Sequence, residues 1–131
     1  MRDMSPLARK LLIKPGSRVA LVNPPPGYAA RLRPLPDDAT LVDVQPELDV
    51  LQVFVHDRAA LDQAASSLGS VRTGGLLWVC YPKGGRRAGT DLNRDLLWEA
   101  MAEHGLTGVT LVSVDDTWSA MRFRPAGEVG T

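Results

Sequence analysis

The sequence has a single cysteine, no net charge and no long apolar run. Cys80 has no partner for an internal disulfide, so nothing indicates an oxidising compartment. The 15 basic and 15 acidic side chains cancel, which argues against a nucleic-acid-binding protein, because such proteins usually carry a basic excess. The longest apolar run, residues 76–81, is far shorter than the roughly 20 residues that cross a bilayer. We therefore expect a cytoplasmic protein that binds neither membrane nor nucleic acid.

The composition is that of one ordinary folded domain. The chain has 131 residues, of which 44% are hydrophobic and 23% are charged, so it is long enough to bury its own core. We expect residues 1–131 to form a single domain and residues 125–131 to be a flexible tail.

Apolar runs alternate with helix signals along the chain. Strands are expected at residues 19–22, 40–44, 48–55 and 76–81, with Gly74 and Gly75 forming a tight turn before the last of them. A closing hairpin is expected from residues 109–114 and 118–124. Ser5 with Pro6 indicates the start of a helix that runs to Lys14, and a short helix is expected at residues 28–32. Asp57 is expected to cap the next helix, and Thr90 or Asp91 the last one.

This alternation predicts an α/β fold. Strands that are apolar on both faces belong to a parallel sheet covered by helices, and right-handed crossovers then place helices on both sides. We expect a three-layer α/β/α sandwich with a Rossmann-like, mostly parallel sheet of about six strands. The C-terminal antiparallel hairpin would add an antiparallel strand at the edge.

Several segments resemble the class I SAM-dependent methyltransferases. Residues 12–19 are similar to the approach to the first strand of that family, and residues 48–50 to the opening of its fourth strand. Residues 71–77 resemble the turn into its fifth strand, and Gly105 with Leu106 and a hairpin resembles its C-terminal end. The whole chain more closely resembles a family of short bacterial proteins known only as a domain of unknown function, which implies a fold and no activity.

The chain departs from the methyltransferase pattern at the cofactor loop. That family has a glycine-rich motif after its first strand, whereas Pro24, Pro25 and Pro26 stand there in this sequence, between Asn23 and Gly27. Prolines supply no N–H donors and lack the conformational freedom of glycine. Residues 45–47 are too few for the third strand of the family and its helix. Asp43 matches the acidic residue that binds ribose hydroxyls in that family.

A ligand would lie outside the carboxyl ends of the parallel strands, where the strand order reverses. Asn23, Gly27, Tyr28, Asp43, His56 and Tyr81 frame that crevice. The alternative is that the prolines fill the crevice and seal it. His56 follows a long strand, where a catalytic base would be useful, although a histidine there is more often structural.

The segment from Lys83 to Thr90 is basic and rich in glycine. Lys83, Arg86 and Arg87 just before a helix start would suit a phosphate or another anion, and the alternative is a solvated connector. Cys80 lies within a strand, where a thiol is inert, and no Cys or His pair has metal-ligand spacing. Trp98 falls off the apolar stripe of its helix, which would suit a self-association or partner surface.

These observations favour an uncharacterised, non-catalytic α/β module that binds a small anionic ligand or a partner protein. The alternative is a trimmed methyltransferase-like enzyme that binds an adenosine-type cofactor. Because the glycine motif is missing, we expect no resident cofactor and absent or weak SAM binding, and whether the chain is an enzyme stays open.

Overall fold

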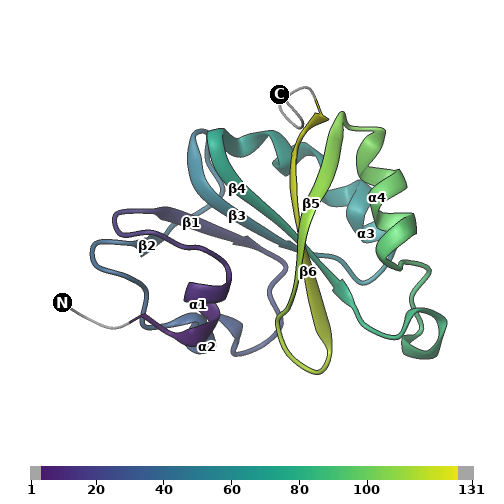
Figure 1. The fold of residues 1–131 in the computed structure, drawn as a ribbon, viewed down its shortest axis with the longest axis horizontal. Helices are drawn as coiled ribbons and strands as arrows, with labels where there is room; N and C mark the ends of the chain where they lie inside the picture. Colours follow the sequence, from purple (N-terminus) through teal and green to yellow (C-terminus); the bar gives the residue numbers. More distant parts are fainter. Residues whose placement is uncertain (1–3, 127–131) are drawn as a thin grey trace.

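The computed structural model describes residues 4–126, which form one mixed sheet with helices on both faces (Figure 1). In chain order the helices and strands are α1 (Pro6–Lys10), β1 (Arg18–Val22), α2 (Tyr28–Leu32), β2 (Thr40–Leu41), β3 (Leu48–Phe54), α3 (Arg58–Ala64), β4 (Val71–Pro82), α4 (Arg94–Ala102), β5 (Leu106–Ser113) and β6 (Trp118–Pro125). Short 3₁₀ helices span Ala65–Ser70 and Gly85–Ala88.

The six strands lie in the order β2-β1-β3-β4-β6-β5. β1, β2, β3 and β4 are mutually parallel, whereas β6 is antiparallel to both β4 and β5. The predicted Rossmann-like sheet with a C-terminal hairpin is therefore confirmed. One detail differs: the antiparallel strand β6 lies inside the sheet, and β5 forms its edge.

Two apolar clusters separate the sheet from its helices, which makes three layers. β3 serves both clusters because successive side chains of a strand point to opposite faces. Leu51 and Val53 pack beneath α3 and α4, whereas Val50 and Phe54 pack beneath α1 and α2. Trp78 on β4 is fully buried and donates a hydrogen bond from Nε1 to the carbonyl oxygen of Leu11 at 3.0 Å. This contact fastens the α1 segment to the centre of the sheet.

Two of the expected helix caps are present. The side chain of Ser5 accepts a hydrogen bond from the Ala8 amide at 3.0 Å, and that of Asp57 accepts one from the Ala60 amide at 2.8 Å. The first helix ends at Lys10 rather than Lys14, and Leu12 beyond it has a positive φ of 64°.

The cap expected at Thr90 or Asp91 was wrong. Asn93 caps α4, and its side chain accepts a hydrogen bond from the Leu96 amide at 2.9 Å. The two expected cap residues are used elsewhere. Thr90 Oγ1 accepts from the Leu92 amide at 3.1 Å, and Asp91 Oδ1 accepts from the Arg58 amide at 2.9 Å.

The boundaries of two strands also differ from expectation. β2 has only two residues, and β4 begins at Val71 instead of residue 76. Leu48 pairs with Val71 and Val50 pairs with Leu76, so β4 carries extra residues opposite Asp49. Gly75 lies within this bulge instead of in a turn, and a Cβ there would lie 3.0 Å from the carbonyl oxygen of Asp49.

The end of the described chain is paired. Pro125 closes β6, and the Ala126 amide donates to the carbonyl oxygen of Gly105 at 2.8 Å. The flexible tail expected from residue 125 therefore does not begin there, and residues 127–131 lie outside the described residues. Within residues 4–126, no helix combines the length and the apolar character needed to cross a membrane.

Candidate functional site

The strand order reverses at β1. From β1 the chain moves to β2 on one side and then to β3 on the other, so the carboxyl ends of β1 and β3 flank a topological switch point. Ligands of open α/β sheets bind outside the strand ends at such a point. Asn23 and His56 follow these two strands, as the sequence analysis expected.

The loop after β1 offers few backbone donors. Asn23 is exposed with a φ of 53°, and the three prolines that follow lack N–H groups. The first amide of α2, that of Tyr28, donates to the Pro25 carbonyl oxygen at 3.0 Å. Gly27 is exposed with a φ of 78°, and no atom lies within 4 Å of the position that a Cβ would take. Gly27 is thus the point of this loop where a ligand can approach the backbone closely.

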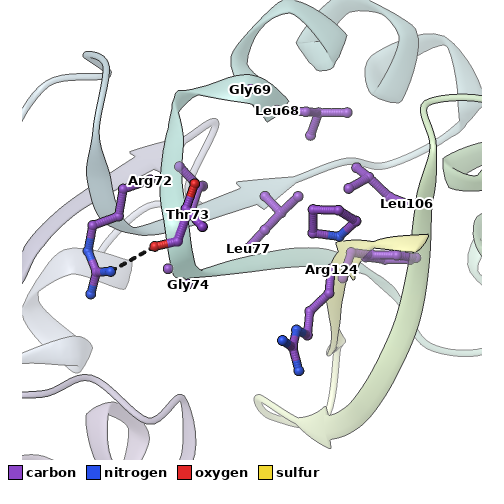
Figure 2. Close-up of a pocket in the computed structure, with 12 residues that line it drawn as sticks. Leu68, Gly69, Arg72, Thr73, Gly74, Leu77, Leu106 and Arg124 are labelled. Carbon is purple, nitrogen blue, oxygen red and sulfur yellow. Dashed lines mark hydrogen bonds between the residues drawn. The ribbon is translucent and has the colours of Figure 1, made fainter. Parts of the chain in front are cut away.

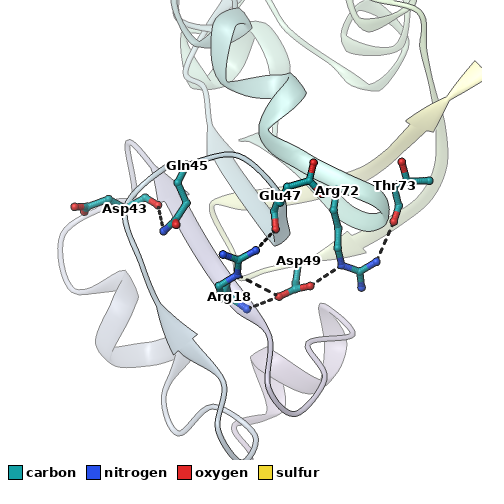
Figure 3. A network of polar contacts seen from close by, with 7 residues as sticks. All are labelled: Arg18, Asp43, Gln45, Glu47, Asp49, Arg72 and Thr73. Atoms are coloured by element: carbon teal, nitrogen blue, oxygen red, sulfur yellow. Dashed lines mark hydrogen bonds and ion pairs between the residues drawn. The ribbon is translucent and has the colours of Figure 1, made fainter.

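Asp43 lies just beyond the carboxyl end of β2 and is exposed. Its backbone carbonyl oxygen accepts a hydrogen bond from Gln45 Nε2 at 3.2 Å, as Figure 3 shows. In the part of the chain that the structure describes, no side chain donates to its carboxylate. Both carboxylate oxygens are therefore accessible to hydroxyl donors from outside the protein.

A row of aromatic rings lies beneath these strand ends. The centroids of Tyr28 and Phe54 are 4.7 Å apart, those of Phe54 and Trp118 are 5.2 Å apart, and those of Trp118 and His56 are 5.2 Å apart. His56 is exposed at the end of the row, so its imidazole meets solvent on one side and the Trp118 ring on the other. The row thus forms an aromatic floor with one histidine side chain at its exposed end.

Two of the expected crevice residues do not line a surface. Tyr28 is only 1% exposed, and its hydroxyl finds no hydrogen-bond partner within residues 4–126. Burial raises the pKa of Tyr28 well above its ordinary value, so the phenol stays protonated. Tyr81 is also buried, and burial likewise raises its pKa. Both residues support the crevice from within and cannot contact a ligand there.

The turn between β5 and β6 brings an acidic group to the same end of the sheet. The carboxylate of Asp115 accepts hydrogen bonds from the amides of Thr117 at 2.7 Å and Trp118 at 2.8 Å, and it pairs with Arg31 at 2.9 Å. Burial opposes the charged form, but these backbone hydrogen bonds and Arg31 together lower the pKa of Asp115. The sequence analysis missed this residue, although an aspartate that opens a turn often accepts such bonds.

The basic loop is not assembled as the sequence analysis expected. Lys83 donates from Nζ to Ser113 Oγ at 2.6 Å, so it is directed toward β5. Arg86 and Arg87 are exposed on the 3₁₀ helix, and Thr90 is buried. Because α4 begins only at Arg94, the loop does not lead directly into the N-terminus of that helix. Residues 89–93 therefore stand in the chain between the two arginines and the first turn of the helix.

A cavity lies at the opposite end of the sheet. It measures about 210 Å³ and is lined by Leu68, Leu77, Phe123 and Arg124 near the amino end of β4 (Figure 2). Beside it, Asp49 accepts hydrogen bonds from the Arg18 amide at 2.8 Å and from Arg72 Nε at 2.5 Å (Figure 3). The Arg18 hydrogen bond, followed by that of Arg72, lowers the pKa of Asp49. Sequence reasoning missed this network, because nothing local indicates that residue 49 lies opposite a bulge.

The described side chains do not gather into a metal site. Within residues 4–126, no group of three His, Cys, Asp or Glu side chains is placed to hold a metal ion. Cys80 is buried in β4, and burial raises its pKa to about 12.

Solved structures share this fold. The crystal structure of ribosomal protein L11 methylase from Lactobacillus delbrueckii subsp. bulgaricus matches 91% of this chain and 74% of its own, with a TM-score of 0.56 and 14% identity. A putative methyltransferase from Thermoplasma acidophilum matches 94% of this chain and 75% of its own, with a TM-score of 0.59 and 12% identity. The DhpI–SAH complex matches 92% of this chain and 83% of its own, with a TM-score of 0.56 and 14% identity.

No protein-family model and no curated protein matches the chain. The resemblance to short bacterial proteins of unknown function therefore stays a prediction. The expectation of a non-catalytic module that binds an anion or a partner protein was wrong, because the matching structures include a methylase, a putative methyltransferase and a complex with SAH, which favour the alternative. The chain has the Rossmann-like fold of the class I SAM-dependent methyltransferases.

Proposed function

We propose that this chain is a methyltransferase-like enzyme domain that binds an adenosine-type cofactor at the carboxyl ends of β1, β2 and β3. The fold supports this proposal, because methyltransferases share it and one matching structure is described as a complex with SAH. We also propose that the protein is cytoplasmic, since its single cysteine gives no sign of an oxidising compartment, and bacterial, as its resemblance to short bacterial proteins implies. The strand order supports the position, because the switch point lies between β1 and β3.

The observation that carries the proposal is the exposed carboxylate of Asp43. It stands beyond the end of β2, beside the strand whose end begins the Asn23–Gly27 loop. An ionised carboxylate has two acceptor oxygens, and vicinal ribose hydroxyls are two donors at matching separation. Within residues 4–126 no other side chain occupies those oxygens. Asp43 would therefore bind the ribose of an adenosine-type cofactor.

The same loop fits the amino-acid part of SAM poorly. A carboxylate and an ammonium group need backbone donors and acceptors nearby, and Pro24, Pro25 and Pro26 provide no N–H groups. The Tyr28 amide is already bonded to Pro25. Gly27 leaves an open approach to the backbone. The residues present thus fit the nucleoside part, and we expect binding energy to come mainly from that part.

His56 is the residue of this chain that would handle a proton at the site. A SAM-type cofactor, when bound, supplies an electrophilic methyl group, and an acceptor atom often has to lose a proton. The imidazole of His56 is exposed at the end of β3 and held against Trp118. Histidine is the side chain that most often accepts such a proton in enzymes.

Calorimetric titration of the chain with adenosine tests the proposal. We expect saturable binding that weakens at least roughly tenfold in Asp43→Asn, because the amide cannot accept from both hydroxyls. 2′,3′-Dideoxyadenosine should bind the parent protein as weakly as adenosine binds the variant. Equal binding of adenosine and dideoxyadenosine would contradict the role of Asp43.

Asp38→Asn is the matched control. Asp38 is exposed and precedes the same strand, at its amino end, so it has similar charge and exposure but lies away from the switch point. Adenosine binding should be unchanged in this variant. If both variants weaken binding equally, the effect is one of overall charge, and the proposed site is wrong. If the parent protein binds no adenosine at all, the proposed function is wrong.

A further inference from the structure

Another cavity lies at the amino ends of β1, β3 and β4, on the face of the sheet that α1 and α2 cover. It measures about 200 Å³, and we call it the Arg122 cavity after its half-buried arginine. Val50 and Leu76 form part of its wall and belong to the apolar cluster on this face. The cavity near Phe123 lies on the other face, because Phe123 packs beneath α3 and α4.

Positive side chains outnumber negative ones in the lining of the Arg122 cavity. Lys14, Arg72 and Arg122 line it together with Asp49, which leaves an excess of two positive charges. Both oxygens of Asp49 already have donors, because one accepts from the Arg18 amide at 2.8 Å and the other from Arg72 Nε at 2.5 Å (Figure 3). Within residues 4–126, Lys14 and Arg122 form no ion pair. The cavity therefore has positive charge that no acidic side chain balances.

The guanidinium group of Arg122 is partly removed from water without a counter-charge. Its Nε is enclosed by the protein and finds no hydrogen-bond partner within residues 4–126. The two terminal nitrogens are not enclosed in this way and remain accessible to a ligand. Burial, followed by the nearby charge of Arg124, lowers the pKa of Arg122, although a guanidinium stays protonated at neutral pH. Because a buried charge without a partner is costly, an anion in the cavity would be stabilising.

Ser17 places an unused hydroxyl group at the same cavity. The residue is only 7% exposed, and in the described part of the chain its side chain makes no hydrogen bond. Its oxygen is not among the enclosed atoms that lack a partner, so it opens to the cavity that the residue lines. The backbone is fixed, because the Ser17 amide donates to the Lys14 carbonyl oxygen at 3.2 Å and the Ser17 carbonyl accepts from Thr40 at 2.9 Å. Ser17 is thus a positioned donor that is free for a ligand.

We propose that the Arg122 cavity binds a small oxyanion of the phosphate type through Arg122, Ser17 and Lys14. A phosphate group is close to doubly negative at neutral pH and has several acceptor oxygens, which matches the two unbalanced cations and the hydroxyl donor. The apolar wall strengthens the attraction, because charges interact more strongly where water is partly excluded. The site lies at the end of the sheet opposite the proposed cofactor site, so it does not depend on the proposed function.

Calorimetric titration of the full chain with inorganic phosphate at low ionic strength tests this inference. We expect saturable binding that weakens at least about tenfold in Arg122→Gln, because a charged hydrogen-bond donor is lost. Ser17→Ala should weaken binding roughly threefold or more, as expected for one neutral hydrogen bond. This second variant removes only a hydroxyl without a protein partner, so it should keep the parental circular dichroism spectrum and the adenosine affinity.

Arg86→Gln is the matched control. Arg86 is exposed on the 3₁₀ helix after β4, at the other end of the sheet, and its replacement changes the net charge by the same amount as Arg122→Gln. The control should bind phosphate like the parent chain. Absence of phosphate binding in the parent chain would overturn the inference, whatever the result with adenosine. So would equal weakening in both arginine variants, weakening in Arg86→Gln alone, or full binding in Ser17→Ala.

Discussion

Asp49 on β3 accepts a hydrogen bond from Arg72 Nε on β4 at 2.5 Å, across the point where β4 bulges away from its partner. The same carboxylate accepts from the Arg18 amide on β1. One side chain thus connects three neighbouring strands at the end of the sheet opposite the proposed cofactor site. The bulge would otherwise leave this part of β3 without regular pairing.

Replacing Asp49 by asparagine should destabilise the fold. The side chain is about one-quarter exposed (23%), and charged hydrogen bonds of this kind contribute about 1–2 kcal/mol after allowance for solvent screening. We expect Asp49→Asn to lower the free energy of unfolding in urea by that amount. Asp62→Asn is the control: Asp62 pairs with Arg58 on the exposed face of α3, and its loss should cost much less, because solvent screens an exposed pair. Equal losses would show that Asp49 does no more than an ordinary surface pair.

The contribution of Asp49 should depend on pH in a defined direction. Its pKa is lowered in the folded protein, first by the Arg18 amide and then by Arg72, so the folded state favours the charged form. That stabilisation is complete above the unfolded pKa of aspartate, about 3.9, and is lost as the pH falls through the folded value. The difference between the parent protein and Asp49→Asn in urea unfolding should therefore be constant near neutral pH and shrink under acidic conditions. A difference that grew on acidification would contradict this assignment.

The Cys80 thiol should be unreactive in the native protein. It is fully buried in β4, and burial raises its pKa to about 12, so almost no thiolate is present at pH 8. We expect iodoacetamide to label the protein only after unfolding in urea, which mass spectrometry would detect. Rapid labelling under native conditions would show that the region around β4 opens readily.

The proline loop should make the amino-acid part of SAH nearly irrelevant to binding. Because Pro24, Pro25 and Pro26 provide no N–H donors, SAH should bind within a few-fold of adenosine in parallel calorimetric titrations. A roughly hundredfold advantage for SAH would correspond to about 2.7 kcal/mol from the amino-acid part. That result would show that other residues, or a rearranged loop, hold the amino acid.

Local signals predicted some elements and failed for others for a clear reason. Ser5 and Asp57 were identified as caps because each bonds an amide three residues away in the chain. The start of α4 was misplaced because several residues before it are capable of capping. Asp91 instead accepts from the amide of Arg58, 33 residues away. Which of these residues caps the helix is thus decided by a distant partner.

The alternation of buried strands with helices was sufficient to predict the Rossmann-like fold. A strand that is buried on both faces has apolar side chains throughout, and the sequence shows them directly. The candidate site was predicted only in part. Asn23, Asp43 and His56 lie at strand ends, which a strand prediction locates, whereas the inward position of Tyr81 depends on its packing. The Asp49–Arg72 bond, the contact of His56 with Trp118 and the position of β5 at an edge join residues far apart in the chain. Only the tertiary structure decided these features, because each depends on which strands become neighbours.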